Sequence, residues 1–478
     1  MGSMVKLYNS LTKNVEDFKS LHPLSVGMYA CGPTVYQFAH IGNFRAYATA
    51  DLLVRVLQYN DYDVNFVMNI TDVGHLVSDA DTGEDKLEKS AKKEGKTAWE
   101  VAEFYTDAFL KDYQALNLTP PATLCKATDH IKEQIDLIQR IEENGFTYTT
   151  PDGIYFDTSL LKDYGKLSSF DKTDAGFTRV DANDQKKNPR DFALWKFSPK
   201  STPDSKRDME WNSPWGKGFP GWHIECSAMS MKYLGETFDI HTGGVDHKEI
   251  HHPNEIAQAE SVTHKPLAKY WLHSSFMLVA GQKMSKSLEN TYTLYDLEKE
   301  GFSALDLRYL YFNAHYRQEM NFTFEALEAG ANALKKLRQE IVKWDEAPDE
   351  EVEGERSRPE GTVREYEKRF LEAVNDDLNM SKALGVMWEL VKSDNPSSAK
   401  STALFKMDRI LGLDLKAQSI EMRKEQGVIP GNIQALVEER QQMRKEKRFN
   451  AADHIRAQIK RLGYDIEDTV KGVKVRKI

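Results

Sequence analysis

The sequence predicts an α/β protein with a Rossmann-type parallel-sheet core, an inserted connective domain, a following α-helical bundle and a small C-terminal module. The core rests on three consecutive segments. Residues 25–31 are an apolar run typical of a buried strand, and residues 41–59 repeat apolar side chains at helical spacing. Apolar residues then alternate at Val64, Phe66 and Met68, as in a second strand. This order predicts a βαβ unit, which binds ligands at the carboxyl ends of its parallel strands.

Changes in composition divide the 478 residues into segments. An irregular stretch with Pro, Gly and Asp interrupts the core, and we interpret it as an insertion between two halves. The expected order is a first half of the core at 4–119, a connective domain at 120–215, a second half of the core at 216–275, a linking domain at 276–322, a helical bundle at 323–412 and a C-terminal module at 413–478. A chain of this length accommodates three or four domains.

The chain after residue 323 is predicted to be helical. Five apolar residues recur with coiled-coil-like spacing and indicate a helix bundle: Leu327, Leu334, Leu337, Ile341 and Trp344. Residues 346–362 are acidic and contain two prolines, so we expect a linker there. Further helices are expected at 363–393 and 401–411, and a second linker at 413–431 precedes two helices and a short hairpin.

The charge of the chain is negative but unevenly distributed. A formal net charge of −10 argues against indiscriminate binding to nucleic acids. Residues 431–478 carry 12 Lys and Arg against 7 Asp and Glu, a net charge of +5, so the rest of the chain carries −15. Taken alone, a solvated helix face explains this basic end as well as an RNA contact does.

The composition favours a soluble, cytoplasmic protein. Hydrophobic residues make up 40% and charged residues 29% of the chain, as in globular proteins. We find no apolar run long enough to span a bilayer and no signal peptide, so no membrane partner is expected. Three cysteines cannot build a disulfide framework, which indicates a reducing cytosol. Of the three, Cys125 is best interpreted as a free, partly buried thiol.

Two short segments carry the residue types that bind a triphosphate. The first signature is His40-Ile41-Gly42-Asn43, and the second signature is Lys283-Met284-Ser285-Lys286-Ser287. His40 lies where the predicted strand passes into the predicted helix, so an imidazole and helix N–H groups face phosphate together. Lys283 and Lys286, on a loop that can move, would close from the other side. Each segment alone also fits a chance string or a solvated loop.

Four further residues make a complete set of zinc ligands if the fold brings them together. They are Cys31, Cys226, His251 and Glu255, with His252 as the adjacent alternative to His251. Their spacing alone does not prove a site. Cys31 at the end of an apolar strand fits a buried small hydrophobe as well. Pro253, interpreted as the first helical residue, would make Glu255 a helix-start carboxylate.

The two signatures, with the histidine signature before the lysine signature in the chain, resemble the paired signatures of class I aminoacyl-tRNA synthetases. Asn43, however, stands where that class usually has histidine. Asparagine still forms hydrogen bonds to ribose or phosphate oxygens but carries no charge. The segments around the four candidate ligands resemble the cysteinyl-tRNA synthetase family. This resemblance runs from Leu7-Tyr8-Asn9-Ser10 to Asp468-Thr469 and includes Asn69-Ile70-Thr71-Asp72 and Phe238-Asp239-Ile240-His241.

The resemblance implies roles for individual residues. Catalysis would depend on His40, Asn43, Lys283 and Lys286. ATP, together with Mg²⁺, would contact His40, Gly42, Asn43, Lys283, Met284, Ser285, Lys286 and Ser287. The substrate cysteine would lie against Thr71, Trp222, His241 and Asp246, with its thiol on one Zn²⁺ ion held by Cys31, Cys226, His251 and Glu255. A soft sulfur ligates zinc better than a hydroxyl does, so the metal would select cysteine over serine.

The implied activity is that of a cysteine–tRNA ligase, with ATP, L-cysteine and tRNA(Cys) as partners and a monomeric chain. The C-terminal module would contact the anticodon end of the tRNA. Three alternatives remain: a zinc-dependent ligase that joins cysteine to an amino sugar, a zinc hydrolase and a non-catalytic RNA-binding paralogue. The helical region after residue 323 disfavours the first, the lack of a His-Glu-x-x-His string disfavours the second, and His40, Lys283 and Lys286 disfavour the third.

Overall fold

The structure is a computed structural model that describes residues 4–74, 85–168, 186–198, 207–284, 290–346, 361–427, 431–469 and 472–478. Ser285, Lys286 and Ser287 of the second signature lie outside the described residues, as does the side chain of Lys283. No helix within the described ranges is both long enough and apolar enough to cross a membrane.

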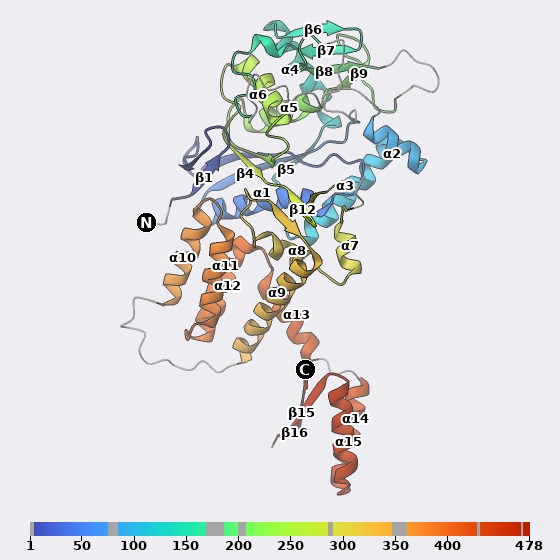
Figure 1. Cartoon of the computed structure of the whole chain (residues 1–478), viewed down its shortest axis with the longest axis vertical. Coiled ribbons are helices and arrows are strands. Elements are labelled where there is room, and N and C mark those ends of the chain that lie inside the picture. Colours follow the sequence, from blue (N-terminus) through green and yellow to red (C-terminus); the bar gives the residue numbers. More distant parts are fainter. Residues whose placement is uncertain are drawn as a thin grey trace.

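A parallel five-stranded sheet forms the core, in the order β11-β10-β3-β4-β5 (Figure 1). Its strands are β3 (Ser25–Ala30), β4 (Asp63–Ile70), β5 (Thr123–Lys126), β10 (Phe238–Gly244) and β11 (Ala268–Ser274). Helix α1 (Ile41–Tyr59) connects β3 to β4, which confirms the predicted βαβ unit. β3 pairs with β4 on one side and with β10 on the other, so the strand order reverses beside β3. Parallel sheets of this kind bind their ligands beside such a reversal, at the carboxyl ends of the strands.

A second, antiparallel sheet lies at one end of the molecule (Figure 1). Its strands are β6 (Thr147–Thr150), β7 (Gly153–Phe156), β8 (Phe192–Phe197) and β9 (Gly218–Pro220). Three helices lie between it and the core sheet: α4 (Ile131–Glu143), α5 (Trp222–Leu234) and α6 (His251–Thr263). The stretch that looks irregular in sequence thus contains a regular sheet, with Trp195 of β8 fully buried.

These strands shift two predicted boundaries. β5 falls in the residues assigned to the insertion at 120–215, yet it pairs with β4, so the core sheet extends beyond residue 119. Only Cys125 is buried among the four residues of β5, because it is an edge strand without the apolar run of a central one. β9 lies after residue 215, yet it pairs with β8 in the sheet of the insertion.

Smaller elements surround the core. The hairpin of β1 (Lys6–Asn9) and β2 (Asn14–Asp17) packs beside β11, and the helix pair α2 (Lys86–Glu94) and α3 (Ala98–Ala115) follows β4. A three-stranded sheet carries the start of the second signature: β12 (Met277–Val279), β13 (Gln282–Lys283) and β14 (Met320–Phe322). Helices α7 (Leu294–Lys299) and α8 (Ala304–Tyr311) lie between β13 and β14 in the chain.

A helical bundle lies on the side of the core opposite the antiparallel sheet (Figure 1). It consists of α9 (Phe324–Glu346), α10 (Val363–Asn375), α11 (Met380–Lys392), α12 (Ser397–Leu411) and α13 (Leu415–Gly427). Leu327, Leu334, Leu337 and Ile341 on α9 are fully buried, as their spacing predicts. These side chains supply the apolar stripe that a bundle helix buries against its neighbours.

Two predictions for this region were wrong. The helix expected at 363–393 is broken, because Asp377 and Leu378 adopt positive φ angles of 54° and 57°. The Asp377 carboxylate accepts hydrogen bonds from Tyr8 N at 2.8 Å and Tyr316 Oη at 2.7 Å, which ties the break to β1. The linker expected at 413–431 contains helix α13, which packs on α9 through a fully buried Leu415.

Arg308 joins the bundle to the core. The residue lies on α8 and is fully buried. Its guanidinium donates to Asp51 Oδ2 on α1 at 2.5 Å, to the Leu411 carbonyl at the end of α12 at 2.6 Å, and to the Leu116 carbonyl after α3 at 3.0 Å. Arg55 completes the cluster, because its Nε donates to Asp51 Oδ1 at 2.9 Å. Charged hydrogen bonds thus fix α1 relative to α12.

The C-terminal module folds around a small core of its own. It contains α14 (Gly431–Lys445), α15 (Phe449–Arg461), β15 (Tyr464–Thr469) and β16 (Gly472–Lys477), which confirms the predicted two helices and hairpin. The buried hydrophobic residues that pack together in this core are Ile433, Val437, Ile455, Ile459 and Ile466. The module lies at the end of the molecule far from the antiparallel sheet (Figure 1).

Candidate active site

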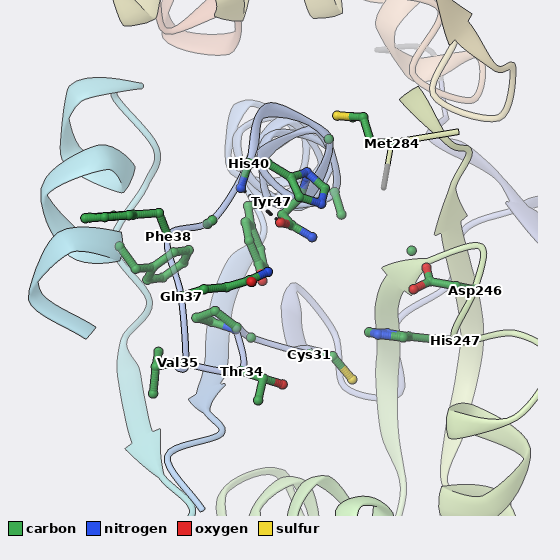
Figure 2. Close-up of a pocket in the computed structure, with 18 of the residues that line it drawn as sticks. Cys31, Thr34, Val35, Gln37, Phe38, His40, Tyr47, Asp246, His247 and Met284 are labelled. Atoms are coloured by element: carbon green, nitrogen blue, oxygen red, sulfur yellow. Dashed lines mark hydrogen bonds between the residues drawn. The ribbon is translucent and has the colours of Figure 1, made fainter. Parts of the chain in front are cut away.

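A cavity of about 340 Å³ lies at the strand-order reversal, beyond the carboxyl ends of β3 and β10. Figure 2 shows His40 on one side of it, Asp246 and His247 on the opposite side, Cys31 at its base and Met284 near its rim. Its volume is that of a small-molecule site. The two signatures therefore meet at one cavity, as far as their residues are described.

His40 and Asn43 form a reciprocal cap at the start of α1. The Asn43 backbone N–H donates to His40 Nδ1 at 3.2 Å, and the His40 backbone N–H donates to Asn43 Oδ1 at 3.1 Å. The cap orients both side chains at the positive end of the helix. Asn43 thus has a structural role here, in addition to lining the cavity with His40.

His40 is partly shielded from water, and this changes its acidity. Burial lowers the pKa of the imidazole below its ordinary value, although the negative charge of Asp246 opposes the shift. A neutral imidazole is therefore favoured near neutral pH. In such a ring Nε2 carries the proton and is a hydrogen-bond donor, while Nδ1 accepts from the backbone of α1.

The four predicted ligands converge below the cavity. The ligand atoms of Cys31, Cys226, His251 and Glu255 all lie within 4.8 Å of one another. The two sulfurs are 3.8 Å apart, Cys31 Sγ is 3.7 Å from Glu255 Oε1, and His251 Nε2 is 3.1 Å from the same oxygen. The group joins the end of β3 with the helices α5 and α6. α6 begins at His251, so Pro253 is its third residue and not its first.

These distances fit a zinc ion. A tetrahedral centre with Zn–S bonds of about 2.3 Å holds two sulfurs about 3.8 Å apart. In a second group of four residues the ligand atoms also lie within 4.8 Å of one another, with His241 and His252 in place of Cys226 and His251. The first group has two soft thiolate donors and matches the ligand sets of zinc sites more closely.

The two thiols of the cluster are difficult to ionise in the absence of a cation. Burial and the neighbouring thiol and carboxylate raise the pKa of Cys31 well above its ordinary value. A hydrogen bond from Cys31 lowers the pKa of Cys226, but burial and Glu255 outweigh it and leave that pKa raised. Both thiols would therefore stay protonated without a compensating charge. A bound divalent cation reverses this preference and stabilises the thiolates.

A layer of histidines surrounds the four residues. His223 Nδ1 lies 2.9 Å from His251 Nδ1, and His241 Nε2 lies 2.8 Å from Glu255 Oε2. His252 Nδ1 is 2.8 Å from His273 Nε2. Contacts of this kind orient metal ligands and fix which ring nitrogen is available.

The predicted pocket residues divide into two groups. Trp222 and Asp246 line the cavity. Thr71 and His241 are buried behind it: Thr71 Oγ1 accepts from Asn69 Nδ2 at 3.0 Å, and His241 contacts Glu255. Thr71 and His241 are thus placed to support the cavity wall from behind.

Sequence reasoning missed several residues of this region. His223 stands three residues before Cys226 on α5, and His247 follows Asp246, so neighbourhood in sequence was a usable signal for both. Asn69, whose Oδ1 lies 3.7 Å from Cys226 Sγ, stands two residues before Thr71 and had the same signal, whereas His273 at the end of β11 had none.

The fold is shared with known synthetases. The structure aligns with the methionyl-tRNA synthetase of Mycobacterium tuberculosis in complex with methionyl-adenylate at a TM-score of 0.55 and 15% identity, over 83% of this chain and 91% of that one. It aligns with the LeuRS of Agrobacterium radiobacter K84, in a ternary complex with tRNA and LeuAMS, at a TM-score of 0.58 and 12% identity, over 84% and 86%. At these identities the likeness concerns the fold alone.

Residues 17–332 match the family model of the class I (C) tRNA synthetase catalytic domain, so fold and sequence together define a class I synthetase. Residues 427–476 match the anticodon binding domain of cysteinyl-tRNA ligases. The chain is 45% identical to cysteine–tRNA ligase 1 of Burkholderia lata, over 98% of this chain and 96% of that one. It is 44% identical to the cysteine–tRNA ligase of Treponema denticola, over 97% and 98%. The chain belongs to the cysteine–tRNA ligase family.

Proposed function

We propose that this protein activates L-cysteine with ATP and transfers it to the 3′-terminal adenosine of tRNA(Cys). The observation that carries the proposal is the buried pair Cys31 and Cys226, with His251 and Glu255, at the base of the cavity beside His40. A thiol substrate in that cavity would reach a place where two soft sulfur ligands gather. The family membership of the whole chain supports the same activity.

The ATP site is proposed at the rim of the cavity. The phosphates, with Mg²⁺, would lie between His40 and Gly42 on α1 and the second signature, which comprises Lys283, Met284, Ser285, Lys286 and Ser287. The start of α1 presents backbone N–H groups and a positive dipole end to the phosphates. Lys283 and Lys286 would stabilise the charge that develops on pyrophosphate as it leaves.

The metal site is proposed for zinc, held by Cys31, Cys226, His251 and Glu255. When bound, Zn²⁺ supplies a Lewis-acid centre that favours a thiolate over a hydroxyl. Around it, Trp222 would wall the substrate pocket, and Asp246 would hold the substrate ammonium group. Thr71 and His241 are proposed as positioning residues behind this wall. Asn43 would act with His40 through the cap at the start of α1.

The chemistry then needs two substitutions. A carboxylate oxygen of cysteine attacks the α-phosphorus, the bond to the bridging oxygen breaks, and pyrophosphate carries away the electron pair. A ribose hydroxyl of the terminal adenosine, proposed as the 2′-hydroxyl, next attacks the carbonyl carbon. AMP leaves, and a phosphate oxygen accepts the hydroxyl proton. Positioning and charge stabilisation supply most of the rate enhancement in such transfers.

We further propose that the chain works as a monomer. A place in the cytosol is proposed because Cys31 and Cys226 must stay reduced to serve as ligands. The amino-sugar ligase is disfavoured by the bundle α9–α13 and by the module at 431–478. That module carries the net positive charge through which the tRNA anticodon end would bind.

Exchange of labelled pyrophosphate into ATP tests the first substitution, with L-serine and no amino acid as controls. Charging of mixed tRNA with labelled cysteine tests the second. We expect exchange to depend on cysteine and charging to depend on both substrates. Exchange without charging would favour a different acceptor for the cysteinyl group, and the absence of cysteine-dependent exchange would refute the proposed function.

A further inference from the structure

Aromatic side chains lie exposed at the rim of the cavity. Phe38, after β3, and Phe104, on α3, leave 48% and 46% of their surfaces exposed, and their ring centroids are 5.9 Å apart. Tyr105 stands edge-on to Phe38 at 5.0 Å. Phe38 and Tyr105 also line the cavity, and Figure 2 shows Phe38 beside the helices that flank it. We name Phe38, Phe104 and Tyr105 the rim aromatics. A contiguous aromatic group with two exposed rings marks an interaction surface.

The rim aromatics are held in place by α2 and the residues that follow it. Tyr105 Oη donates to Glu94 Oε1 at 2.7 Å, and Lys96 Nζ lies 4.6 Å from the centre of the Phe104 ring. Ser90 Oγ on α2 donates to the carbonyl of Tyr36, two residues before Phe38, at 2.9 Å. The rings are therefore presented by a fixed scaffold, which lowers the entropy cost of binding.

The adjoining helix is basic, although the chain as a whole is acidic. α2 and the turn after it carry five lysines: Lys86, Lys89, Lys92, Lys93 and Lys96. The two acidic residues among them reduce the net charge of residues 86–96 to +3, and Glu88 accepts from Asp208 N at 2.8 Å while Glu94 accepts from Tyr105 and Lys96. On α3, Glu100 caps the helix, and Glu103 and Asp107 are exposed. A positive field thus lies on the α2 side of the rim aromatics.

We infer that the rim aromatics and the lysines of α2 bind the unpaired 3′ end of the tRNA as it enters the cavity. This inference rests on the proposed function, which requires a single strand of RNA to reach the space beside His40. Stacking on aromatic rings, with cations along the backbone, is how proteins hold single-stranded nucleic acid. The continuity of the surface with the cavity, through Phe38 and Tyr105, distinguishes this occupant from a protein partner that would bind at a remote face.

Phe104→Ala tests the inference, because Phe104 does not line the cavity. Loss of one stacking ring should weaken tRNA binding about tenfold and raise the KM for tRNA similarly. Cysteine-dependent pyrophosphate exchange, measured without tRNA, should not change. Phe104→Trp should retain wild-type binding. Trp99→Ala is the matched control: Trp99 is also 46% exposed on α3 but packs near Trp211, away from the rim aromatics.

A shortened tRNA makes the test specific. Removing the unpaired 3′ nucleotides should weaken binding to the wild-type chain about tenfold more than it weakens binding to the Phe104→Ala chain, which keeps the other contacts of the 3′ end. Equal losses for the two chains, or a Phe104→Ala chain that charges tRNA with unchanged KM, would overturn the inference. A wild-type chain that charges no tRNA would instead refute the proposed function.

Discussion

Met284 of the second signature lies against Gly42 of the first. A Cβ atom at position 42 would overlap Met284 Cε and would lie 3.1 Å from His40 Nδ1. Glycine therefore lets the Met284 side chain lie directly against the start of α1, and a larger residue would require this flexible side chain to move. Two segments far apart in the chain thus meet at position 42.

The first prediction concerns this contact. Gly42→Ala should slow formation of the cysteinyl adenylate about tenfold or more, because the added methyl group pushes Met284 and His40 away from the phosphates. Single-turnover activation kinetics measure the effect, and circular dichroism checks the fold. Adding Met284→Ala should restore part of the rate, since it removes the overlapping atoms. If the double variant is slower than Gly42→Ala, the contact is not the cause.

The second prediction concerns the metal. Cys226→Ser should lower bound zinc and raise the KM for cysteine at least tenfold, because a harder oxygen replaces a soft sulfur ligand. Zinc content is read by elemental analysis independently of activity. Cys125→Ser is the matched control: Cys125 is also buried and reduced, but its Sγ lies 3.5 Å from the carbonyl of Met68 and outside the cluster. Full zinc content in a Cys31→Ser/Cys226→Ser chain would contradict the assignment.

The third prediction concerns the junction of core and bundle. Arg308→Met should reduce the free energy of unfolding by about 3–5 kcal/mol, because it removes the buried partner of Asp51 and leaves Arg55 as the remaining cation beside this buried carboxylate. Urea unfolding provides the measurement. Arg369→Met removes a short but exposed ion pair, with Glu389 at 2.7 Å, and should cost at most about 1 kcal/mol. Similar losses in the two variants would show that burial does not govern the energetics here.

The same junction predicts a dependence on pH. Burial raises the pKa of Asp51, but Arg308 and Arg55 outweigh it and hold that pKa below its usual range. A carboxyl with a lowered folded-state pKa stabilises the fold above its unfolded value of about 4, and this contribution is lost as the pH falls through the folded-state pKa. The free energy of unfolding of the Asp51→Asn chain should thus fall less than that of the wild-type chain when the pH is lowered from about 5 to about 3. Parallel stability curves would refute this role of Asp51.

A truncation tests the C-terminal module. Removing residues 431–478 should leave cysteine-dependent pyrophosphate exchange intact and raise the KM for tRNA, because a segment of net charge +5 is lost. The cut must follow α13, since Leu413 and Leu415 are fully buried against the bundle. A cut at residue 413 would also remove α13 from α9 and destabilise the bundle, so a change in the KM for tRNA would no longer report on the module alone. An unchanged KM for tRNA in the shorter chain would exclude the module from tRNA binding.

Sequence patterns were sufficient to predict an element where one continuous stretch of residues determines it. The bounds of α1 follow from its apolar spacing and from the polar cap at His40. They failed for β5, because an edge strand with one buried residue has no apolar run, and for α13, because few of its residues are apolar. The candidate ligands were named from resemblance, but the contacts of His273 and Asn69 depend on which strands become neighbours. The rim aromatics were missed because exposure is a property of the folded surface.

The order of the core sheet has a consequence for synthesis. β3 ends at Ala30, but its neighbour β10 begins only at Phe238. At about 5–20 residues per second, a ribosome needs roughly 10–40 s to deliver that neighbour. During this interval one edge of β3 has no native strand to pair with, whereas the insertion can close its own sheet once β9 emerges. The nascent chain therefore carries an unpaired strand edge, open to misassociation, until the second half of the core leaves the exit tunnel.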